Sequence, residues 1–442
     1  MVEGRCAATP HSDLSKRVNV DTRTFSGSLT GMDQCIGIDF VVLLDAEMRL
    51  NVEPIIVPTN AVSWLDRAMG RPGGLSANLV LSGTTDDGLS FFSDSVHVRS
   101  HHVSNGNLTV GLSFAKAHIE GRLELSDIPP MLKLHLRGFK SYPPSVLMSS
   151  LGTVRIGGAV RTVSNDQLSG HISITAPSEG VNPDWRVCAE EMIWFILRGL
   201  SFASGKHIHP AALEVALDGT LGRTFFSGRS EGVGLAPVSF MEHRNFTQAL
   251  VRRYESLPPV PEMLWTVIGW LNHDSSTDQA RLLSALTALE TLCEHIVPKT
   301  VTTLLPKSEF APVRAKLEDV VSNASLPAAQ EKALMLRISM VNGVSFVDKL
   351  KALRDHYRLH PSDFSDEEIA KLVKLRNQLV HRGRGDDGAR SEWGSIVFVR
   401  ELLSLSIFRE IHYSGPYQSY LNGCRTTRPA LDGSSLQCTE LD

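Results

Sequence analysis

Three polar side chains stand near the end of one predicted helix, and their types suit the handling of protons and anions. The segment 365–385 reads SDEEIAKLVKLRNQLVHRGRG and contains Arg376, Asn377 and His381. Asn377 and His381 are four residues apart, so a helix places them side by side. The helix dipole favours the charged form of a histidine at a C-terminus, which suits a group that takes and returns a proton near neutral pH. The spacing therefore indicates acid–base chemistry beside a guanidinium.

Arg376 occupies a position where this helix should be apolar. At about 100° per residue, the stripe expected to be buried consists of Ile369, Leu372, Val373, Leu379 and Val380. Arg376 lies near the middle of that stripe. An unpaired buried guanidinium costs several kcal/mol, so Arg376 needs a carboxylate partner or a cleft open to solvent and ligand. Glu290, at the edge of the apolar face of a predicted helix, is the most plausible partner within the chain.

Simpler interpretations remain open for each of these residues. Arg376 and Glu290 can form a purely structural ion pair, although the same pair can also orient a catalytic arginine. His381 can be an ordinary residue at a helix end. Arg382 and Arg384, which flank a glycine, can complement the negative end of the helix dipole.

The segment RNQLVH at 376–381 resembles the R-x4–6-H motif of HEPN domains, in which a polar residue commonly follows the arginine. A β-rich N-terminal region, the helix LLSALTALETLCEH and the segment KLRNQLVHRG are together similar to the ApeA-like family of anti-phage HEPN proteins. The helical likeness rests on a motif. The N-terminal likeness rests on architecture and on the order of segments.

The resemblance implies metal-independent RNA cleavage in an abortive-infection response, with two chains pairing their motifs at a dimer interface. A ribose 2′-OH would attack the adjacent phosphodiester, with His381 as general base or acid and Arg376 neutralising charge on the phosphorane oxygens. Asn377 would hold the imidazole or the scissile phosphate. Arg382 and Arg384 would contact neighbouring phosphates. The implied partners are an RNA substrate, a second copy of the chain and a phage-derived activator, with no metal and no cofactor.

A second match to the R-x4–6-H pattern, six residues apart rather than five, occurs at Arg354 and His360 in the helical segment DKLKALRDHYRLHP. This pair is a competitor, because Asp355 can stand in the polar position. Pro361 directly follows His360 and forces that residue out of helical geometry. The charged neighbours of Arg354 also favour an exposed face. We therefore favour the later pair.

Other polar clusters do not indicate a metal or phosphate site. Histidines 207, 209 and 243 lack cysteines or carboxylates at a recurrent spacing. The glycines of GRPGG at 70–74 precede no G-K-[ST] and are typical of a turn.

The composition is that of an ordinary globular protein with two to three domains. The 442 residues are 42% hydrophobic and 21% charged, with a formal net charge of −4. Six scattered cysteines without a C-x-x-C pair favour a reducing, cytoplasmic setting. No apolar run approaches the roughly 20 residues that cross a bilayer, so we expect no membrane partner. With near-balanced charge, any contact with nucleic acid requires a local basic cluster.

The elements that position the candidate site change in type along the chain. Residues 18–181 alternate short apolar runs with turn residues, which predicts a β-rich sandwich or barrel-like domain. Residues 182–257 read as a connecting region with a helix and a hairpin. Residues 258–413 read as an all-α HEPN-like bundle, so the fold class is α+β. A flexible N-terminus, 1–17, and a loosely held polar tail, 414–442, flank these regions.

Two patterns within these regions bear on function. Alternation in LKLHLR at 132–137 predicts a strand with leucines on one face and Lys133, His135 and Arg137 on the other, which is expected to be solvent-exposed. Beyond Pro237, helical spacing covers Met263–Leu271, Asp278–Ile296, Val313–Val321, Ala328–Met340, Phe346–Leu359, Asp366–His381 and Trp393–His412.

The hypothesis that follows is a β-rich sensor or regulatory region joined to a helical endoribonuclease that acts as a homodimer. Transfer RNA is a candidate substrate. The alternative is a non-catalytic HEPN module that binds RNA or dimerises, joined to a ligand-sensing β domain.

Overall fold

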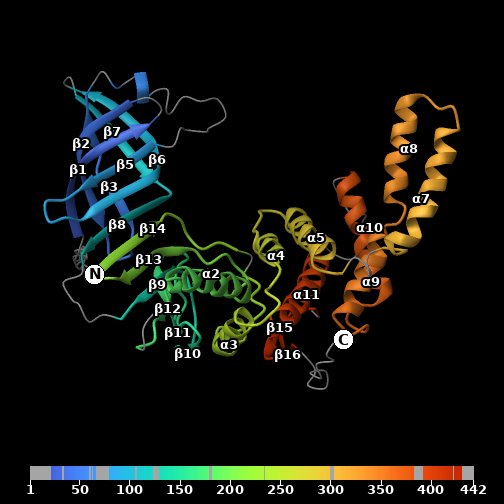
Figure 1. Ribbon diagram of the computed structural model, residues 1–442. Coiled ribbons are helices and arrows are strands. Elements are labelled where there is room, and N and C mark those ends of the chain that lie inside the picture. The colour runs from blue at the N-terminus through green and yellow to red at the C-terminus, as the bar shows by residue number, and fades with distance from the viewer. Residues whose placement is uncertain are drawn as a thin grey trace, which may run out of the picture. The chain divides into compact units, whose positions relative to one another are not determined.

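The computed structural model describes residues 21–31, 34–58, 61, 63–65, 79–104, 107–122, 129–178, 182–232, 234–298, 303–382, 392–421 and 423–430. These residues form two compact units. The first takes its residues from 21–122 and from Pro210–Gly228, and the second comprises the rest. Antiparallel β-structure comes first along the chain and helices follow, which confirms the α+β class (Figure 1).

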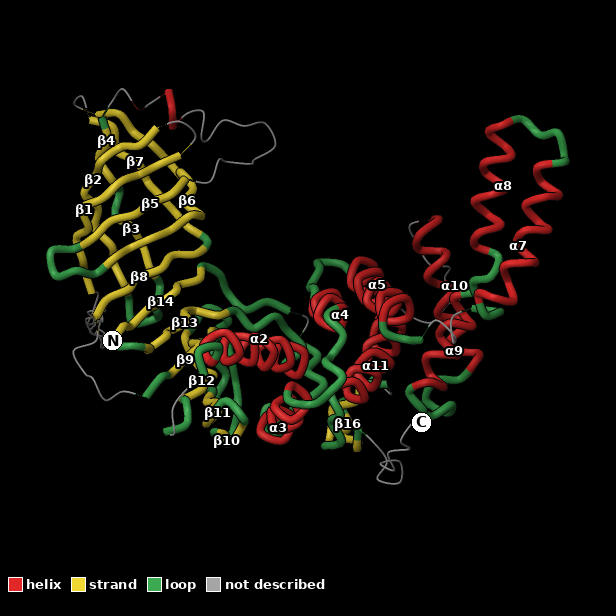
Figure 2. The backbone as a smooth tube through the Cα atoms, in the orientation of Figure 1, coloured by secondary structure: helices red, strands yellow, loops and turns green. Residues whose placement is uncertain are grey.

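The first unit is an antiparallel sheet. Its strands are β1 (Asp21–Gly31), β2 (Gln34–Leu44), β3 (Leu50–Val52), β4 (Ile55–Val57), β5 (Leu79–Thr84), β6 (Ser90–Ser104), β7 (Asn107–Phe114), β8 (Lys116–Arg122), β13 (Pro210–Leu217) and β14 (Thr220–Phe226). Their order is β13-β14-β8-β6-β5-β1-β2-β3, and β7 pairs with both β6 and β4. The long β6 pairs with β5 and β8 through its first half and with β7 through its second half, and the sheet curls strongly (Figure 2).

The inner face of this curled sheet is apolar and partly aromatic. Phe25, Phe40 and Phe91 are at most 2% exposed, and their ring centroids lie 5.3–5.6 Å apart. These residues come from β1, β2 and β6, whose alternating sequences send every second side chain inward. Stacked and tilted ring pairs of this kind add to the stabilisation that burial supplies.

The expected domain boundaries at 181 and 257 differ from the division into compact units. The hairpin predicted in the connecting region exists, and its turn uses Asp218 and Gly219 with φ of 52° and 71°. Its strand β14 pairs with β8 along seven residues, so the hairpin belongs to the first unit. Residues 129–178, which we expected in the N-terminal domain, belong instead with the helices.

The second unit begins with a four-stranded antiparallel sheet. Its strands, in spatial order, are β10 (Ser145–Ser149), β11 (Gly152–Gly157), β12 (Leu168–Thr175) and β9 (Met131–Arg137). Helix α2 (Trp185–Ala203) packs on β9 and β12 (Figure 1). The predicted wet face of β9 needs correction, because His135 and Arg137 are buried. Arg137 donates to the main-chain oxygen of Asp166, in the turn before β12.

The remaining helices follow the predicted segments closely. They are α3 (His243–Tyr254), α4 (Met263–Asn272), α5 (Asp278–His295), α7 (Lys307–Ser322), α8 (Ala328–Met340), α9 (Phe346–His356), α10 (Asp366–Arg382) and α11 (Glu392–Glu410). Helix α3 was not predicted. Helix α7 starts earlier than expected and contains Pro312 in its second turn, where the missing N–H costs one hydrogen bond without ending the helix. No helix within the described ranges is long and apolar enough to span a membrane.

Helix α11 forms the centre of the helical part. Every residue of 395–408 is buried, so this helix is covered on all sides, and it packs against α5. The prediction of a loosely held tail is wrong for Pro416–Ser419 and Thr426–Pro429. These segments, β15 and β16, form a separate two-stranded antiparallel sheet. The reason is packing: Tyr417 is 3% exposed, and its hydroxyl donates to buried Glu401 of α11 at 2.8 Å. Residues 1–17 and 431–442 lie outside the described residues.

Candidate functional site

Helix α10 forms as its sequence predicts. The hydroxyl of Ser365 accepts a hydrogen bond from the main-chain N–H of Glu368 at 3.3 Å, which caps the first turn. Four of the five stripe residues are buried, namely Ile369, Leu372, Val373 and Leu379. Leu375 is buried as well. This apolar face packs α10 against α9 and α5, and it sets which side chains of the helix meet α5.

Arg376 contacts the carboxylate that the sequence suggested. Its Nε and Nη2 donate to Oε1 of Glu290 on α5, at 3.1 and 2.8 Å. Its Nη1 donates to the side-chain oxygen of Asn377 at 3.1 Å. The structure therefore brings Arg376, Asn377 and Glu290 together, with the guanidinium as the link.

The guanidinium also lies over an aromatic ring that sequence reasoning missed. The central carbon of Arg376 is 5.8 Å from the ring centroid of Phe346, the first residue of α9. The start of α9 is defined by Ser345, whose hydroxyl accepts from the N–H of Asp348 at 3.2 Å. A cation over an aromatic face is attracted by the ring quadrupole, so α5, α9 and α10 each contribute one group that orients Arg376.

The site lies at the surface. The side chains of Arg376 and Glu290 are 31% and 38% exposed, and Asn377 and His381 are exposed. Val380, which we expected in the buried stripe, is 53% exposed. The apolar contacts of α10 therefore stop one turn before its end, and the last turn projects His381 into solvent.

The far end of the site is only partly described. Among the described residues, none forms a hydrogen bond or ion pair with His381. Arg382 is the last residue of α10, and Arg384 lies outside the described residues. The predicted contacts of these two arginines with phosphate therefore remain predictions.

The geometry leaves Arg376 able to bind an anion. Three of its five N–H groups are used, and no described residue accepts the second N–H of either terminal nitrogen. Two free N–H groups on a guanidinium suit the oxygens of a phosphate. Asn377 accepts a hydrogen bond from the guanidinium and lies one helical turn before His381, so it is placed between Arg376 and His381 along α10.

The competing pair is arranged differently. Arg354 is 9% exposed, which corrects the expectation of an exposed face. It donates to Asp355, to the main-chain oxygen of Phe364 and to Asp366, at 2.8, 3.0 and 2.7 Å. Helix α9 ends at His356, so His360 lies outside it, as Pro361 predicted.

The histidines at 207, 209 and 243 do not gather into one cluster in the described structure. The rings of His207 and His209 lie 6.3 Å apart, and His243 is buried with its ring stacked on Phe139 at 5.6 Å. Burial lowers the pKa of His243 to about 4, so this imidazole is neutral near pH 7. Within the described part of the chain, no three His, Cys, Asp or Glu side chains are grouped as metal ligands.

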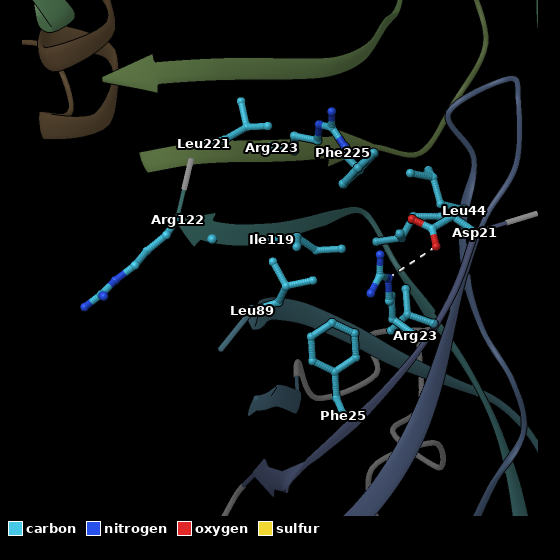
Figure 3. A pocket seen from close by; sticks show the side chains of 13 residues that line it. Asp21, Arg23, Phe25, Leu44, Leu89, Ile119, Arg122, Leu221, Arg223 and Phe225 are labelled. Atoms are coloured by element: carbon cyan, nitrogen blue, oxygen red, sulfur yellow. Dashed lines mark ion pairs between the residues drawn. The ribbon is translucent and has the colours of Figure 1, made fainter. Parts of the chain in front are cut away.

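A cavity of about 200 Å³ lies within the first unit, lined by residues from β1, β2, β3, β8 and β14 and by Leu89 (Figure 3). Its wall is mostly apolar and includes Phe25, Leu44, Leu89, Ile119, Leu221 and Phe225. Arg23 reaches into this space and forms an ion pair with Asp21 at 3.2 Å, whereas Arg122 points away from it. Sequence reasoning missed this cavity, because its residues come from separate strands.

The chain matches no protein-family model, no curated protein and no solved structure. The candidate site therefore rests on its own geometry and on the motif at 376–381.

Proposed function

We propose that this protein is a metal-independent endoribonuclease of an anti-phage, abortive-infection response, with a HEPN-type helical domain. The observation that carries the proposal is the partly exposed guanidinium of Arg376, which Glu290 and Asn377 hold one to two helical turns before His381. This arrangement combines an anion-binding group with an imidazole, a side chain that can accept and donate a proton.

The chemistry is transfer of the phosphoryl group to the neighbouring ribose oxygen. The 2′-oxygen attacks phosphorus while a base takes its proton, and the bond to the 5′-oxygen breaks as an acid protonates that oxygen. The products are a 2′,3′-cyclic phosphate and a 5′-hydroxyl. Arg376 stabilises the charge on the phosphorane oxygens, and Asn377 holds the imidazole or the phosphate.

A second copy of the chain completes this site. The reaction needs a base and an acid at the same time, whereas one chain offers a single histidine on α10. Two α10 helices that meet at their last turns supply two imidazoles and two guanidinium groups around one phosphate. The exposure of Asn377, Val380 and His381 leaves that turn open to such a contact.

The decisive experiment is cleavage of total RNA and transfer RNA in EDTA by purified wild type and His381→Ala. We expect the variant to lose about 10²–10⁴-fold in rate, the range of a positioned proton-transfer group. Cyclic-phosphate ends on the products identify 2′-OH attack.

His360→Ala is the matched control, because His360 follows an arginine by six residues, one more than His381 does, but lies outside its helix. It should cleave at the wild-type rate. Unchanged cleavage by His381→Ala would remove the nuclease assignment from this site, and RNA binding without any cleavage would support the non-catalytic module.

The cavity favours a second function for the first unit, the sensing of a small ligand. Its mostly apolar wall suits a small aromatic ligand, and 200 Å³ is enough for a single ring. Benzoate should raise the unfolding temperature of wild type but not of Leu221→Trp, in which the indole fills the cavity. An equal response of both proteins would exclude this cavity as the binding site.

A further inference from the structure

The four-stranded sheet of the second unit has a charge opposite to that of the whole chain. The charged residues of 129–178 are Lys133, Arg137, Lys140, Arg155, Arg161 and Asp166. Five basic residues against one acidic residue give this segment a net charge of +4, whereas the chain carries −4. A local basic cluster of this kind is what binding of a polyanion requires.

Strand register gathers much of this charge on one face. The leucines of β9 are buried on the side of α2, so Lys133 and His135 lie on the opposite face. His171 of β12 pairs directly with His135, and Ser173 with Lys133. Arg155 of β11 pairs with Ser173. Directly paired side chains are about 5 Å apart at Cβ, so four cationic or titratable side chains occupy two adjacent rows.

A groove of about 540 Å³ crosses this face, and its lining includes His135, Val146, Arg155, Gly157, Gly170 and His171. We call it the basic groove. A Cβ on Gly157 would come within 2.7 Å of Cε1 of His171, so the glycine makes room for the imidazole. None of the described residues that line the groove is acidic.

The described lining of the groove contains one permanently charged side chain, Arg155, together with two histidines, and none of its residues is a carboxylate. Burial lowers the pKa of His171, and the positive charge of Lys133 and the neighbouring His135 lower it further. The other charged group that faces His171 is Arg155 of β11, since β10 contributes only Ser145 and Val146 to the lining. An anion in the groove would reverse this repulsion and favour the protonated imidazole.

We propose that the basic groove binds the sugar–phosphate backbone of single-stranded RNA, as a docking surface for the substrate of the nuclease. This inference rests on the proposed function. No Phe, Tyr or Trp lines the groove among the described residues, so it offers no aromatic ring on which bases stack. Recognition is therefore of phosphates, with little preference for sequence.

The test measures binding of a fluorescent twelve-nucleotide oligouridylate to the full chain carrying His381→Ala, in EDTA. Lys133→Gln/Arg155→Gln removes the charge of Arg155, which lines the groove, and the charge of Lys133 in the same row of the sheet face. Each phosphate contact on a single strand contributes about 0.7 to the slope of log affinity against log salt, and therefore about fivefold at 0.1 M salt. We expect about 25-fold weaker binding and a slope lower by about 1.4.

The matched control is Lys332→Gln/Arg337→Gln, which removes one lysine and one arginine charge from the exposed surface of α8. It should bind as its parent does. Equal affinity of the groove variant and its parent would overturn the inference, as would an equal loss in the control.

The pH dependence gives a second readout. Binding by the parent should strengthen as pH falls from 8 to 6, because bound phosphate raises the pKa of His171 and the protonated form binds better. His171→Gln should flatten this dependence. If the affinity of the parent protein did not change with pH, His171 would be excluded as a group that binds the RNA phosphates.

These results are separable from the proposed function. If wild type cleaves RNA while Lys133→Gln/Arg155→Gln binds normally, the groove proposal alone fails. If wild type cleaves no RNA but the groove variant loses binding, the nuclease proposal alone fails.

Discussion

Two arginines on neighbouring helices stand at nearly the same spacing from a histidine but have different surroundings. Arg354 of α9 has a side chain only 10% exposed and donates to the carboxylates of Asp355 and Asp366. Arg376 of α10 is 31% exposed and contacts one carboxylate, Glu290, together with an amide. The first arginine ties two helices together, because Asp366 begins α10. The second presents its free N–H groups at the surface.

The two histidines differ in the same way. His360 lies beyond the end of α9, and its Nδ1 pairs with the hydroxyl of Ser362 at 2.7 Å. His381 stays on α10 and is exposed in its last turn. A spacing of five or six residues is therefore compatible both with an enclosed arginine and with a partly exposed one. The two pairs differ in the burial of the arginine and in whether the histidine lies within the helix or beyond its end.

The largest expected effect concerns Arg376. Arg376→Gln should lower the rate of RNA cleavage by about 10²–10³-fold, as removal of a donor to a developing oxyanion does. The transition temperature should change little, because the side chain is partly exposed and surface ion pairs contribute at most about 1 kcal/mol. Single-turnover cleavage and thermal unfolding measure the two effects. If Arg376→Gln cleaved RNA at the wild-type rate, Arg376 would have no role in cleavage, as we expect for Arg354.

His243 differs from His381 in burial, because its side chain is enclosed whereas that of His381 is exposed. The pKa of His243 is lowered to about 4 by burial, below its ordinary value near 6.5. Between these values the unfolded chain binds a proton that the folded protein does not. The free energy of unfolding should therefore fall by up to about 3 kcal/mol as pH decreases from 6.5 to 4.

Urea unfolding of wild type and His243→Phe across this pH range measures the effect. The variant keeps a ring against Phe139 and should lose less stability in acid. Identical pH profiles for the two proteins would show that another group causes the acid loss.

The next effect concerns Arg354. Arg354→Met should lower the free energy of unfolding by about 1–3 kcal/mol, because the main-chain oxygen of Phe364 loses its buried donor. Cleavage below the transition temperature should stay at the wild-type rate. Urea denaturation measures the first effect, and an RNA cleavage assay measures the second. If Arg354→Met were stable but inactive, the active site would have to be assigned to α9.

The smallest expected effect concerns Glu290, which we interpret as a positioning residue. Glu290→Gln replaces the ionised acceptor of the Arg376 guanidinium by a neutral amide oxygen, at a cost of about 1.4 kcal/mol, or tenfold in rate. The loss should appear in kcat with KM nearly constant, and Glu290→Asp should restore part of it. A purely structural ion pair would instead leave kcat unchanged in the folded enzyme.

The helical half of the fold was predictable because its signals are local. Prolines, caps and apolar stripes define each helix within a few residues of its observed ends, as Ser365 does for α10. The division of the chain into two compact units was less predictable. Residues 210–228 join the first sheet through pairing of β14 with β8, about a hundred residues earlier in the chain, and no local pattern encodes that pairing.

The candidate site shows the same division. Arg376 and Glu290 were paired from helical periodicity alone, since each stands out against an apolar stripe. Phe346, the cavity and the basic groove were not, because each depends on contacts between separate elements. The burial of Arg354 was predicted incorrectly, since its charged neighbours turned out to be its partners.

The amino-acid sequence determined which helices form and which side chains on α10 are chemically capable, since hydrogen bonding and side-chain period act within a few residues. Tertiary structure decided which arginine is enclosed and which is open, and which basic residues meet on one sheet face. Those outcomes depend on desolvation and on the distance between charges, and both are set only when distant segments pack together.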